Sequence, residues 1–354
     1  MKKSFLQKLK TGLCLMLLAG ALAGCASSDA RAQYDDACEA LEAGEYETAM
    51  EGFSAVAESG TLTGRAYRGL GLAQLFAGKE ADACISFERS LLYADGENDA
   101  FLRDVTLYLA HARTLHGETD KAIELYTELL NKEQDAGVFF LRGRLLLQED
   151  REDEAGADFD RAAVLADDYE LFVNIFQVYE DAGKSADGAA YLEKALELLP
   201  ADEDNYYERG LVQYYLQNYQ EAKDILIEGV RENREDVDSI FLLGRVYLAM
   251  DDVPDARAVY TEHLENETLT AYAYNGLALC DMAEEDYEAA LENIEAGLDK
   301  DADGDAKKGL LFNRIVVLEY LEKWDEAREQ AAEYAALYPT DEQGLRENAF
   351  LESR

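Results

Sequence analysis

The sequence predicts an all-α fold: a right-handed superhelical solenoid of about nine helix-turn-helix units, closed by a C-terminal capping helix. The first observation is a small residue that returns about every 34 positions. A second small residue lies twelve positions earlier in seven of nine cases, and a bulky residue lies four positions later in eight of nine. A fixed period with fixed chemistry at fixed offsets is typical of stacked supersecondary units. The returning small residues, which we call anchors, are Ala49, Ala83, Ala122, Ala155, Gly188, Ala222, Ala256, Ala290 and Ala327.

Each unit is predicted to contain two amphipathic helices, as a unit near the middle of the chain illustrates. Apolar side chains recur at helical spacing up to Tyr215, and Gln217 and Asn218 then interrupt the pattern. A second apolar stripe with the same spacing begins at Tyr219. We expect the small residues where two helix backbones approach closely, with the bulky residue filling the space beside them.

The repeat resembles the tetratricopeptide repeat (TPR) family over about residues 30–338. The aromatic position of the family's first helix is matched by Tyr67, Phe139, Phe172, Tyr206 and Tyr274. The aromatic position of its second helix is matched by Tyr46, Tyr219, Tyr287 and Trp324. Phe176 and Ile315 depart from the pattern because they stand at small positions. The resemblance implies that the first helices line a concave groove that binds proteins or peptides.

The N-terminus is interpreted as a bacterial lipoprotein signal. Residues 1–24 form the signal peptide, because a basic start precedes an apolar stretch shorter than the roughly 20 residues that span a bilayer. The motif Leu22-Ala23-Gly24-Cys25 resembles a lipobox, which implies cleavage before Cys25 and its acylation. The alternative is an ordinary signal peptide with a chance cysteine. We expect an extracytoplasmic, lipid-anchored protein, in the outer membrane if the cell has two membranes.

The mature chain is divided into three further segments. Residues 25–30 form the lipidated cysteine and a short tether, and residues 31–339 form nine TPR-like repeats. Residues 340–354 form the capping segment, in which we expect Leu345, Phe350 and Leu351 to turn inward.

The charge of the chain is strongly negative, with 75 acidic residues against 33 Lys and Arg and a net charge of −42. Removal of residues 1–24 takes away four lysines and no acid, so the mature charge is −46. This charge argues against nucleic acid as a partner, because such binding requires lysines and arginines that neutralise phosphates. Two explanations stay open: a charged surface that keeps a solenoid soluble, or a basic partner attracted by the field.

The sequence contains no catalytic constellation, and we predict that the protein is not an enzyme. The three histidines, His111, His116 and His263, lie near no nucleophile in a recognisable motif. A phosphate-binding loop, a nucleophile elbow and a zinc-binding HExxH helix are all missing from the sequence. No cofactor is expected apart from a weak calcium ion.

The calcium hypothesis concerns one acidic loop. Asp299, Asp301, Asp303 and Asp305 alternate as in the first half of a calcium-binding loop, with Gly304 at the sharp turn. The second half does not match, because Leu310 stands where a bidentate glutamate belongs. A solvated acidic turn is therefore the favoured interpretation, and a weak calcium site is the alternative.

The predicted groove is the main candidate for a binding site. In the family, the residues fifteen and eleven positions before each anchor face it, and we call these the outer and inner groove positions. Arginine and aromatic residues dominate this set, as they do the energetic centres of protein interfaces. Alternatively, the aromatics only pack and the arginines only pair with nearby acids. The set comprises Tyr34, Arg68, Leu72, Leu107, His111, Phe140, Arg144, Gln177, Tyr207, Phe241, Arg245, Asn275 and Phe312.

Three functions follow from these observations. The first is a membrane-anchored, non-catalytic module that binds a peptide or helix of an envelope or secreted protein in its groove. For this function we expect Arg68→Glu, Arg144→Glu and Arg245→Glu to weaken binding without unfolding the array. The second is a structural assembly factor of an envelope, pilus or secretion complex, and the third is a calcium-responsive surface protein.

Overall fold

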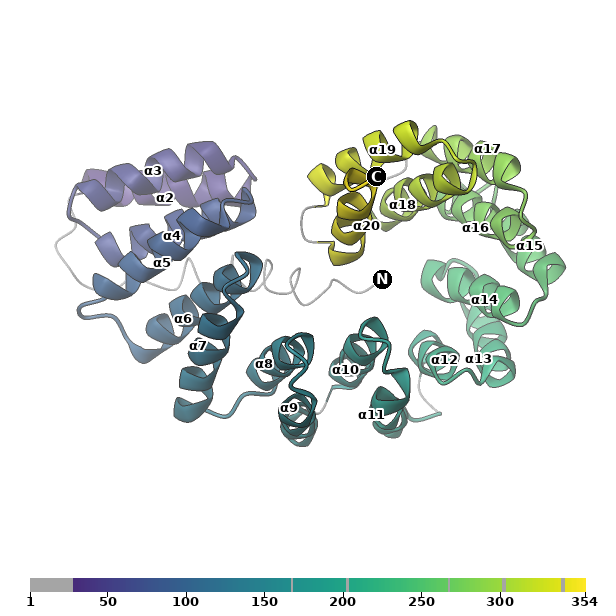
Figure 1. The fold of residues 1–354 in the computed structure, drawn as a ribbon, viewed down its shortest axis with the longest axis horizontal. Coiled ribbons are helices and arrows are strands. Elements are labelled where there is room, and N and C mark those ends of the chain that lie inside the picture. The colour runs from purple at the N-terminus through teal and green to yellow at the C-terminus, as the bar shows by residue number, and fades with distance from the viewer. Residues whose placement is uncertain (1–27, 167, 202–203, 267, 301–303, 339–340) are drawn as a thin grey trace. The chain divides into compact units, whose positions relative to one another are not determined.

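The computed structural model describes residues 28–354 except 167, 202–203, 267, 301–303 and 339–340. Within these ranges the chain forms 19 α-helices and no strand, which confirms the all-α class (Figure 1). The signal peptide, Cys25, Asp301 and Asp303 lie outside the described residues.

The helices form nine consecutive pairs and one closing helix, as the repeat predicts. The pairs are α2 (Ser28–Glu42) with α3 (Tyr46–Glu58), α4 (Thr63–Phe76) with α5 (Glu80–Leu92), α6 (Asp99–Leu115) with α7 (Thr119–Lys132), α8 (Ala136–Gln148) with α9 (Glu152–Leu165), α10 (Tyr169–Asp181) with α11 (Ser185–Glu197), α12 (Tyr206–Tyr215) with α13 (Tyr219–Glu232), α14 (Val237–Ala249) with α15 (Val253–Glu262), α16 (Thr270–Ala283) with α17 (Tyr287–Leu298), and α18 (Gly304–Tyr320) with α19 (Trp324–Leu337). The closing helix is α20 (Glu342–Glu352).

The described residues divide into two compact units. The N-terminal unit contains α2 to α9 and the last turns of α10, residues 177–185 included. The C-terminal unit contains residues 168–176 at the start of α10 and then α11 to α20. No helix in the described part of the chain is both long and apolar enough to cross a membrane.

The anchors lie in the second helix of every pair, and all nine are buried. The small residue twelve positions earlier lies against the bulky residue four positions later. A Cβ added to Gly244 would lie 2.1 Å from the ring of Tyr260, and one added to Gly143 would lie 2.8 Å from the ring of Phe159. The two helices of a unit therefore approach closely because glycine leaves room for a buried ring.

The two departures from the small position are both accommodated in the core. Ile315 is fully buried in the same cluster as Ala331, so the large and small residues have exchanged places in this unit. Phe176 is also buried, and its ring lies 5.3 Å from that of Tyr215. In the unit of Ile315, the exchange with Ala331 keeps the packed volume although the residue types differ.

A left-handed residue ends the first helix of every pair, five positions before the anchor. Glycine takes this conformation in four units and a non-glycine residue takes it in five. The next amide then donates to a carbonyl five residues earlier, as Lys79 does to Gln74 and Asn218 does to Gln213. This bond satisfies a carbonyl at the helix end and fixes the tight turn. The nine residues are Gly44, Gly78, Gly117, Asp150, Gly183, Gln217, Asp251, Glu285 and Glu322.

The closing helix α20 packs on α19, but only part of its apolar side faces inward. Leu351 is 1% exposed, as predicted. Leu345 and Phe350 are 40% and 45% exposed, so the prediction for these two residues is wrong. Phe350 instead lies beneath the guanidinium of Arg354, 4.8 Å from ring centroid to Cζ, on the outer side of the helix.

Candidate functional site

The outer groove positions of the N-terminal unit are mostly buried. Arg68 on α4 has a side chain only 7% exposed, and its Nε donates a hydrogen bond of 2.5 Å to Asp104 on α6. Its guanidinium also lies 5.6 Å from the ring centroid of Tyr108. Burial alone would lower the pKa of Arg68, but the charge of Asp104 raises it on balance. Arg68 and Asp104 therefore form a structural ion pair. Arg68→Glu would place two carboxylates together inside the unit, contrary to our expectation that this variant does not unfold the array.

Two aromatic groove residues of this unit pack inside it. Tyr34 on α2 lies edge-on to Phe53, with ring centroids 5.5 Å apart, and burial raises the pKa of its hydroxyl. Phe140 on α8 is buried against Phe159, with centroids 6.3 Å apart. The contacts of Tyr34 and Phe140 therefore agree with the alternative interpretation, in which the groove aromatics only pack inside the protein.

Leu72, an inner groove position of the N-terminal unit, is fully buried, whereas three other inner positions of this unit are half-buried. His111 on α6, Arg144 on α8 and Gln177 on α10 share this intermediate exposure. Desolvation, together with the positive charge of Arg144, lowers the pKa of His111 to about 4. His111 is therefore a neutral imidazole at neutral pH.

The C-terminal unit presents its groove residues differently. Arg245 on α14 lies over the ring of Tyr214, 5.0 Å from Cζ to centroid, and its Nη2 donates to the Tyr214 hydroxyl at 3.3 Å. Tyr207 on α12 is half-buried, and burial together with the charge of Asp238 raises its pKa. The guanidinium is thus held by an aromatic ring, which leaves its other edge able to donate hydrogen bonds.

The remaining groove residues of this unit divide between packing and partial exposure. Asn275 on α16 is buried, and its Oδ1 accepts a hydrogen bond of 2.7 Å from Asn313. Phe312 on α18 is half-buried and lies edge-on to Tyr334, with centroids 5.7 Å apart. Phe241 on α14 is half-buried and lies 5.8 Å from Tyr260.

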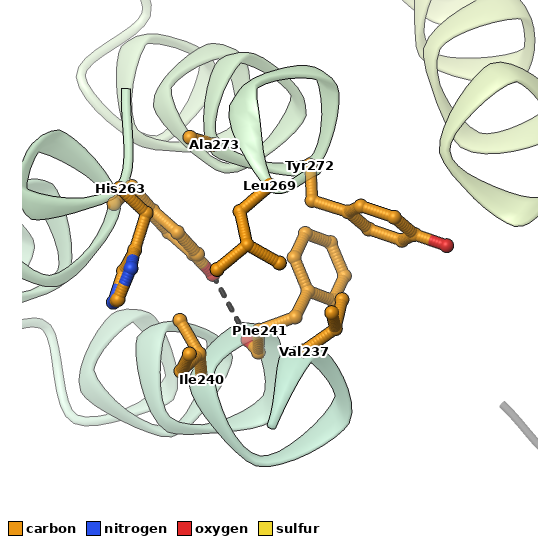
Figure 2. Close-up of a pocket in the computed structure, with 8 residues that line it drawn as sticks. Val237, Ile240, Phe241, His263, Leu269, Tyr272 and Ala273 are labelled. Atoms are coloured by element: carbon orange, nitrogen blue, oxygen red, sulfur yellow. Dashed lines mark hydrogen bonds between the residues drawn. The ribbon is translucent and has the colours of Figure 1, made fainter. Parts of the chain in front are cut away.

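Phe241 also lines a small apolar hollow between α14, α15 and α16, which sequence reasoning missed (Figure 2). The Tyr260 hydroxyl donates a hydrogen bond of 3.1 Å to the backbone carbonyl of Phe241, and this bond holds α15 against α14. Most lining residues lie at the ends of helices, away from the groove positions. They are Val237, Ile240, Phe241, Tyr260, His263, Leu269, Tyr272 and Ala273.

The acidic loop is described only in part. Asp299 ends α17, Asp305 lies in the first turn of α18, and Gly304 has the positive φ of 48° expected at a sharp turn. Among the described residues, no group of three His, Cys, Asp or Glu side chains could hold a metal ion. Asp301 and Asp303 fall outside those residues, so the calcium hypothesis stays a prediction.

Comparison with family models supports the repeat on both sides of the unit boundary. Residues 109–170 and 207–275 match the model described as a tetratricopeptide repeat. One matched range lies almost wholly in the N-terminal unit and the other in the C-terminal unit. Residues 245–337 also match the model of the coatomer epsilon subunit. A comparison with curated proteins finds no match.

Solved structures similar to this chain include three repeat proteins. A tetratricopeptide repeat protein from Parabacteroides merdae is 19% identical, covers 81% of this chain and 98% of its own, and has a TM-score of 0.44. Yeast Tom70 is 16% identical, and the match covers 91% of this chain and 88% of the Tom70 chain, with a TM-score of 0.48. PilF of Pseudomonas aeruginosa is 22% identical, with coverage of 57% and 90% and a TM-score of 0.38.

Proposed function

We propose that this protein is a membrane-anchored, non-catalytic interaction module that binds a peptide or helix of an envelope or secreted protein. The TPR-type fold is a protein-interaction fold. The observation that carries the proposal is the surface of the C-terminal unit formed by Tyr207, Phe241 and Arg245. Half-buried tyrosine, phenylalanine and arginine are the side chains that dominate binding energy at protein interfaces.

The mechanism is presentation of a preformed surface. Arg245 is already held by Tyr214, and the ring of Phe241 packs against that of Tyr260, with centroids 5.8 Å apart. Because these groups lose little freedom on binding, moderate contacts suffice for a useful affinity. The buried Arg68, Tyr34 and Phe140 hold the N-terminal unit together instead.

The anchor is proposed to be the acylated Cys25. The motif before it and the apolar stretch of the signal peptide support this assignment, and several acyl chains anchor a protein far more stably than one. Replacement by Cys25→Ser should move the protein from the membrane to the soluble extracytoplasmic fraction. A variant that stays in the membrane fraction, or a wild type without attached lipid in mass spectrometry, would reject the anchor.

The binding proposal is tested by cross-linking in the native cell, followed by affinity capture and mass spectrometry. Arg245→Glu should lose a partner that the wild type captures. Arg231→Glu is the matched control, since Arg231 is exposed in the last turn of α13 and the change in charge is the same. A partner kept by Arg245→Glu places the binding surface elsewhere. Stoichiometric co-purification with a large envelope complex would favour the assembly factor.

A calcium-responsive role of the loop from Asp299 to Asp305 is a separate proposal. Its support is the alternation of carboxylates with a glycine at the turn. Titration calorimetry of the mature protein decides it, because a solvated acidic turn produces no heat at millimolar calcium.

A further inference from the structure

The first helix of the N-terminal unit begins three residues after the cysteine that is proposed to be acylated. The chain from Cys25 to Ser28 can span at most about 11 Å, even when it is fully extended. Acyl chains on Cys25 hold that residue at the surface of the lipid bilayer. The side of the N-terminal unit on which α2 begins is therefore the side nearest the membrane.

All four helix pairs of this unit begin and end on that side. Within each pair three residues separate two helices that pack against each other, so the helices are antiparallel. Ion pairs join the starts of successive first helices. Arg65 on α4 lies 2.7 Å from Glu97, just before α6. Arg103 on α6 lies 2.8 Å from Asp135, just before α8. We call this side, formed by the first-helix starts and second-helix ends of α2 to α9, the proximal edge.

Exposed apolar side chains gather at the proximal edge. Six large apolar residues are exposed in the described part of the N-terminal unit, and four of them lie at the ends of α5 and α9. Two of the four, at 72% and 78%, are the most exposed large apolar residues among the described part of the whole chain. Exposed apolar groups on one side of a protein mark a surface for a partner or a membrane. The four are Leu92, Tyr93, Val164 and Leu165, and we call them the edge residues.

The surroundings of Tyr93 suit an interface between water and hydrocarbon. Its ring stacks on that of Tyr67, with centroids 5.8 Å apart, and the guanidinium of Arg89 lies 5.5 Å from the Tyr67 ring centroid. Tyrosine is enriched at the headgroup level of membranes, and arginine can extend its charge into water while its stem stays on apolar surface. This pair of rings and the arginine above it are half-buried or exposed at the end of α5 and the start of α4.

We propose that the proximal edge rests on the membrane, with the edge residues inserted at the level of the lipid headgroups. The inference rests on the proposed acylation of Cys25 and adds a second contact between the protein and the bilayer. Removal of apolar side chains from water favours the contact. Because the acyl chains already hold the edge beside the lipid, insertion is an intramolecular step and needs little affinity of its own.

The charge of the chain specifies the lipid surface. The protein is strongly acidic, and the exposed Asp95 and Glu133 follow α5 and α7 at the proximal edge. Anionic headgroups would repel these carboxylates, whereas zwitterionic headgroups would not. A second copy of the chain would meet the same repulsion as an anionic membrane. We therefore expect the edge to contact zwitterionic lipid.

The test measures the depth of single tryptophans in the lipidated protein, reconstituted into phosphatidylcholine vesicles. Trp324→Phe removes the only native tryptophan, and each probe is added in this background. Leu92→Trp and Val164→Trp report on the proximal edge. The controls are Ile85→Trp, 49% exposed within α5, and Leu115→Trp, 44% exposed at the opposite end of its pair. We expect brominated phosphatidylcholine to quench positions 92 and 164 and to leave positions 85 and 115 unquenched.

A second set of variants links the quenching to the apolar contact. Leu92→Asp in the protein that carries Val164→Trp should reduce the quenching at position 164, because one inserted side chain is replaced by a charge. Leu115→Asp is the matched control and should leave that quenching unchanged. Vesicles that contain anionic phosphatidylglycerol should give weaker quenching at position 164 than vesicles of phosphatidylcholine alone. Circular dichroism confirms that each variant is folded.

Three results would overturn the inference: equal quenching at positions 92 and 115, no quenching at positions 92 and 164, or stronger quenching with phosphatidylglycerol. Flotation of the same vesicles separates these results from failure of the lipid anchor. Protein that floats with the vesicles but is not quenched at positions 92 and 164 keeps the anchor and rejects the contact. Protein that does not float rejects the acylation of Cys25 and the contact with it.

Discussion

The N-terminal and C-terminal units use the same repeat but differ at their outer groove positions. In the N-terminal unit Arg68 is buried and paired with Asp104. In the C-terminal unit Tyr207 and Phe241 are half-buried, and an apolar hollow opens beside Phe241. The outer groove position therefore holds a buried ion pair in one unit and half-buried aromatic side chains in the other.

The turns differ between the units in the same way. In the N-terminal unit the left-handed residue is glycine except at Asp150. In the C-terminal unit all four are non-glycine residues, namely Gln217, Asp251, Glu285 and Glu322. Non-glycine residues in this conformation store strain of roughly 1 kcal/mol each. The C-terminal unit thus has half-buried residues at outer groove positions and a non-glycine residue at each of its four turns.

The largest effect is expected from Gly244→Ala. The added Cβ would lie 2.1 Å from the Tyr260 ring, which is 1% exposed and packs so closely that a Cβ added to Gly276 would also lie 2.3 Å from it. We expect the free energy of unfolding to fall by about 3 kcal/mol, because the ring has no space to retreat. Gly156→Ala is the control in the N-terminal unit, since its Cβ would lie 3.6 Å from Tyr179 and should stabilise α9 by about 0.5 kcal/mol. Urea unfolding measures the free energy of unfolding of both variants. Equal effects would contradict the close approach of Gly244 to the Tyr260 ring.

The two arginines should separate stability from binding. Arg68→Met leaves Asp104, which is 18% exposed, without its cation, and we expect a loss of about 2 kcal/mol. Arg245→Met removes the cation–π contact with Tyr214 and a hydrogen bond of 3.3 Å to its hydroxyl, and should lose about 0.5 kcal/mol. Urea unfolding measures stability, and partner capture measures binding. If Arg245→Met lowered the free energy of unfolding more than Arg68→Met did, the contrast between a structural arginine in the N-terminal unit and a half-buried one in the C-terminal unit would be wrong.

The two units should also respond to pH with opposite signs. In the N-terminal unit the folded pKa of His111 is about 4, below its ordinary value of 6.5. As the pH falls below 6.5 the unfolded chain takes up a proton and the folded chain does not, so stability is lost as the pH falls toward 4. His111→Gln should flatten thermal stability between these values. An unchanged slope would show that His111 titrates normally.

In the C-terminal unit, Glu319 on α18 should act in the opposite direction. Burial, followed by a hydrogen bond to Glu347 on α20 and the charge of that residue, raises its pKa from 4.5 to about 7. The contribution of protonated Glu319 to the free energy of unfolding is complete below pH 4.5 and is lost as the pH rises through 7. Its amplitude is about 1 kcal/mol after solvent screening. Glu319→Gln should remove this loss, and Glu329→Gln, on an exposed position of α19, is the control. If stability changed with pH equally in Glu319→Gln and in the wild type, the raised pKa of Glu319 would be contradicted.

The smallest effect is expected at the turns. Gln217→Gly should stabilise the C-terminal unit by about 0.5 kcal/mol, because glycine adopts the left-handed conformation without strain. Gly117→Ala, at the equivalent turn of the N-terminal unit, should destabilise by about 1 kcal/mol. Thermal melting detects the opposite signs, and a destabilised Gln217→Gly would mean that this side chain has a role of its own.

The sequence predicted the fold accurately because the signals are local to each pair. An anchor such as Ala256 must be small wherever two helices touch, and its partners Gly244 and Tyr260 lie at fixed distances along the same unit. The left-handed turn was missed, although glycine at Gly44 and Gly78, five positions before the anchors, was a visible signal.

The candidate site was less predictable because it depends on contacts between units of the repeat. The burial of Arg68 follows from Asp104, which lies 36 positions later on another pair. The hollow is lined by residues from three helices, and none of Val237, Leu269 and Tyr272 occupies a groove position. Periodicity within one unit contains no information on how helix ends meet.

The most direct test of the binding surface is site-specific photo-cross-linking in the native cell. A photoreactive amino acid is placed at Tyr272, beside the hollow of the C-terminal unit, or at Leu92, which is 72% exposed in the N-terminal unit. We predict a cross-linked partner protein from position 272 and none from position 92. A partner joined at position 92 and absent at position 272 would contradict binding through the C-terminal unit.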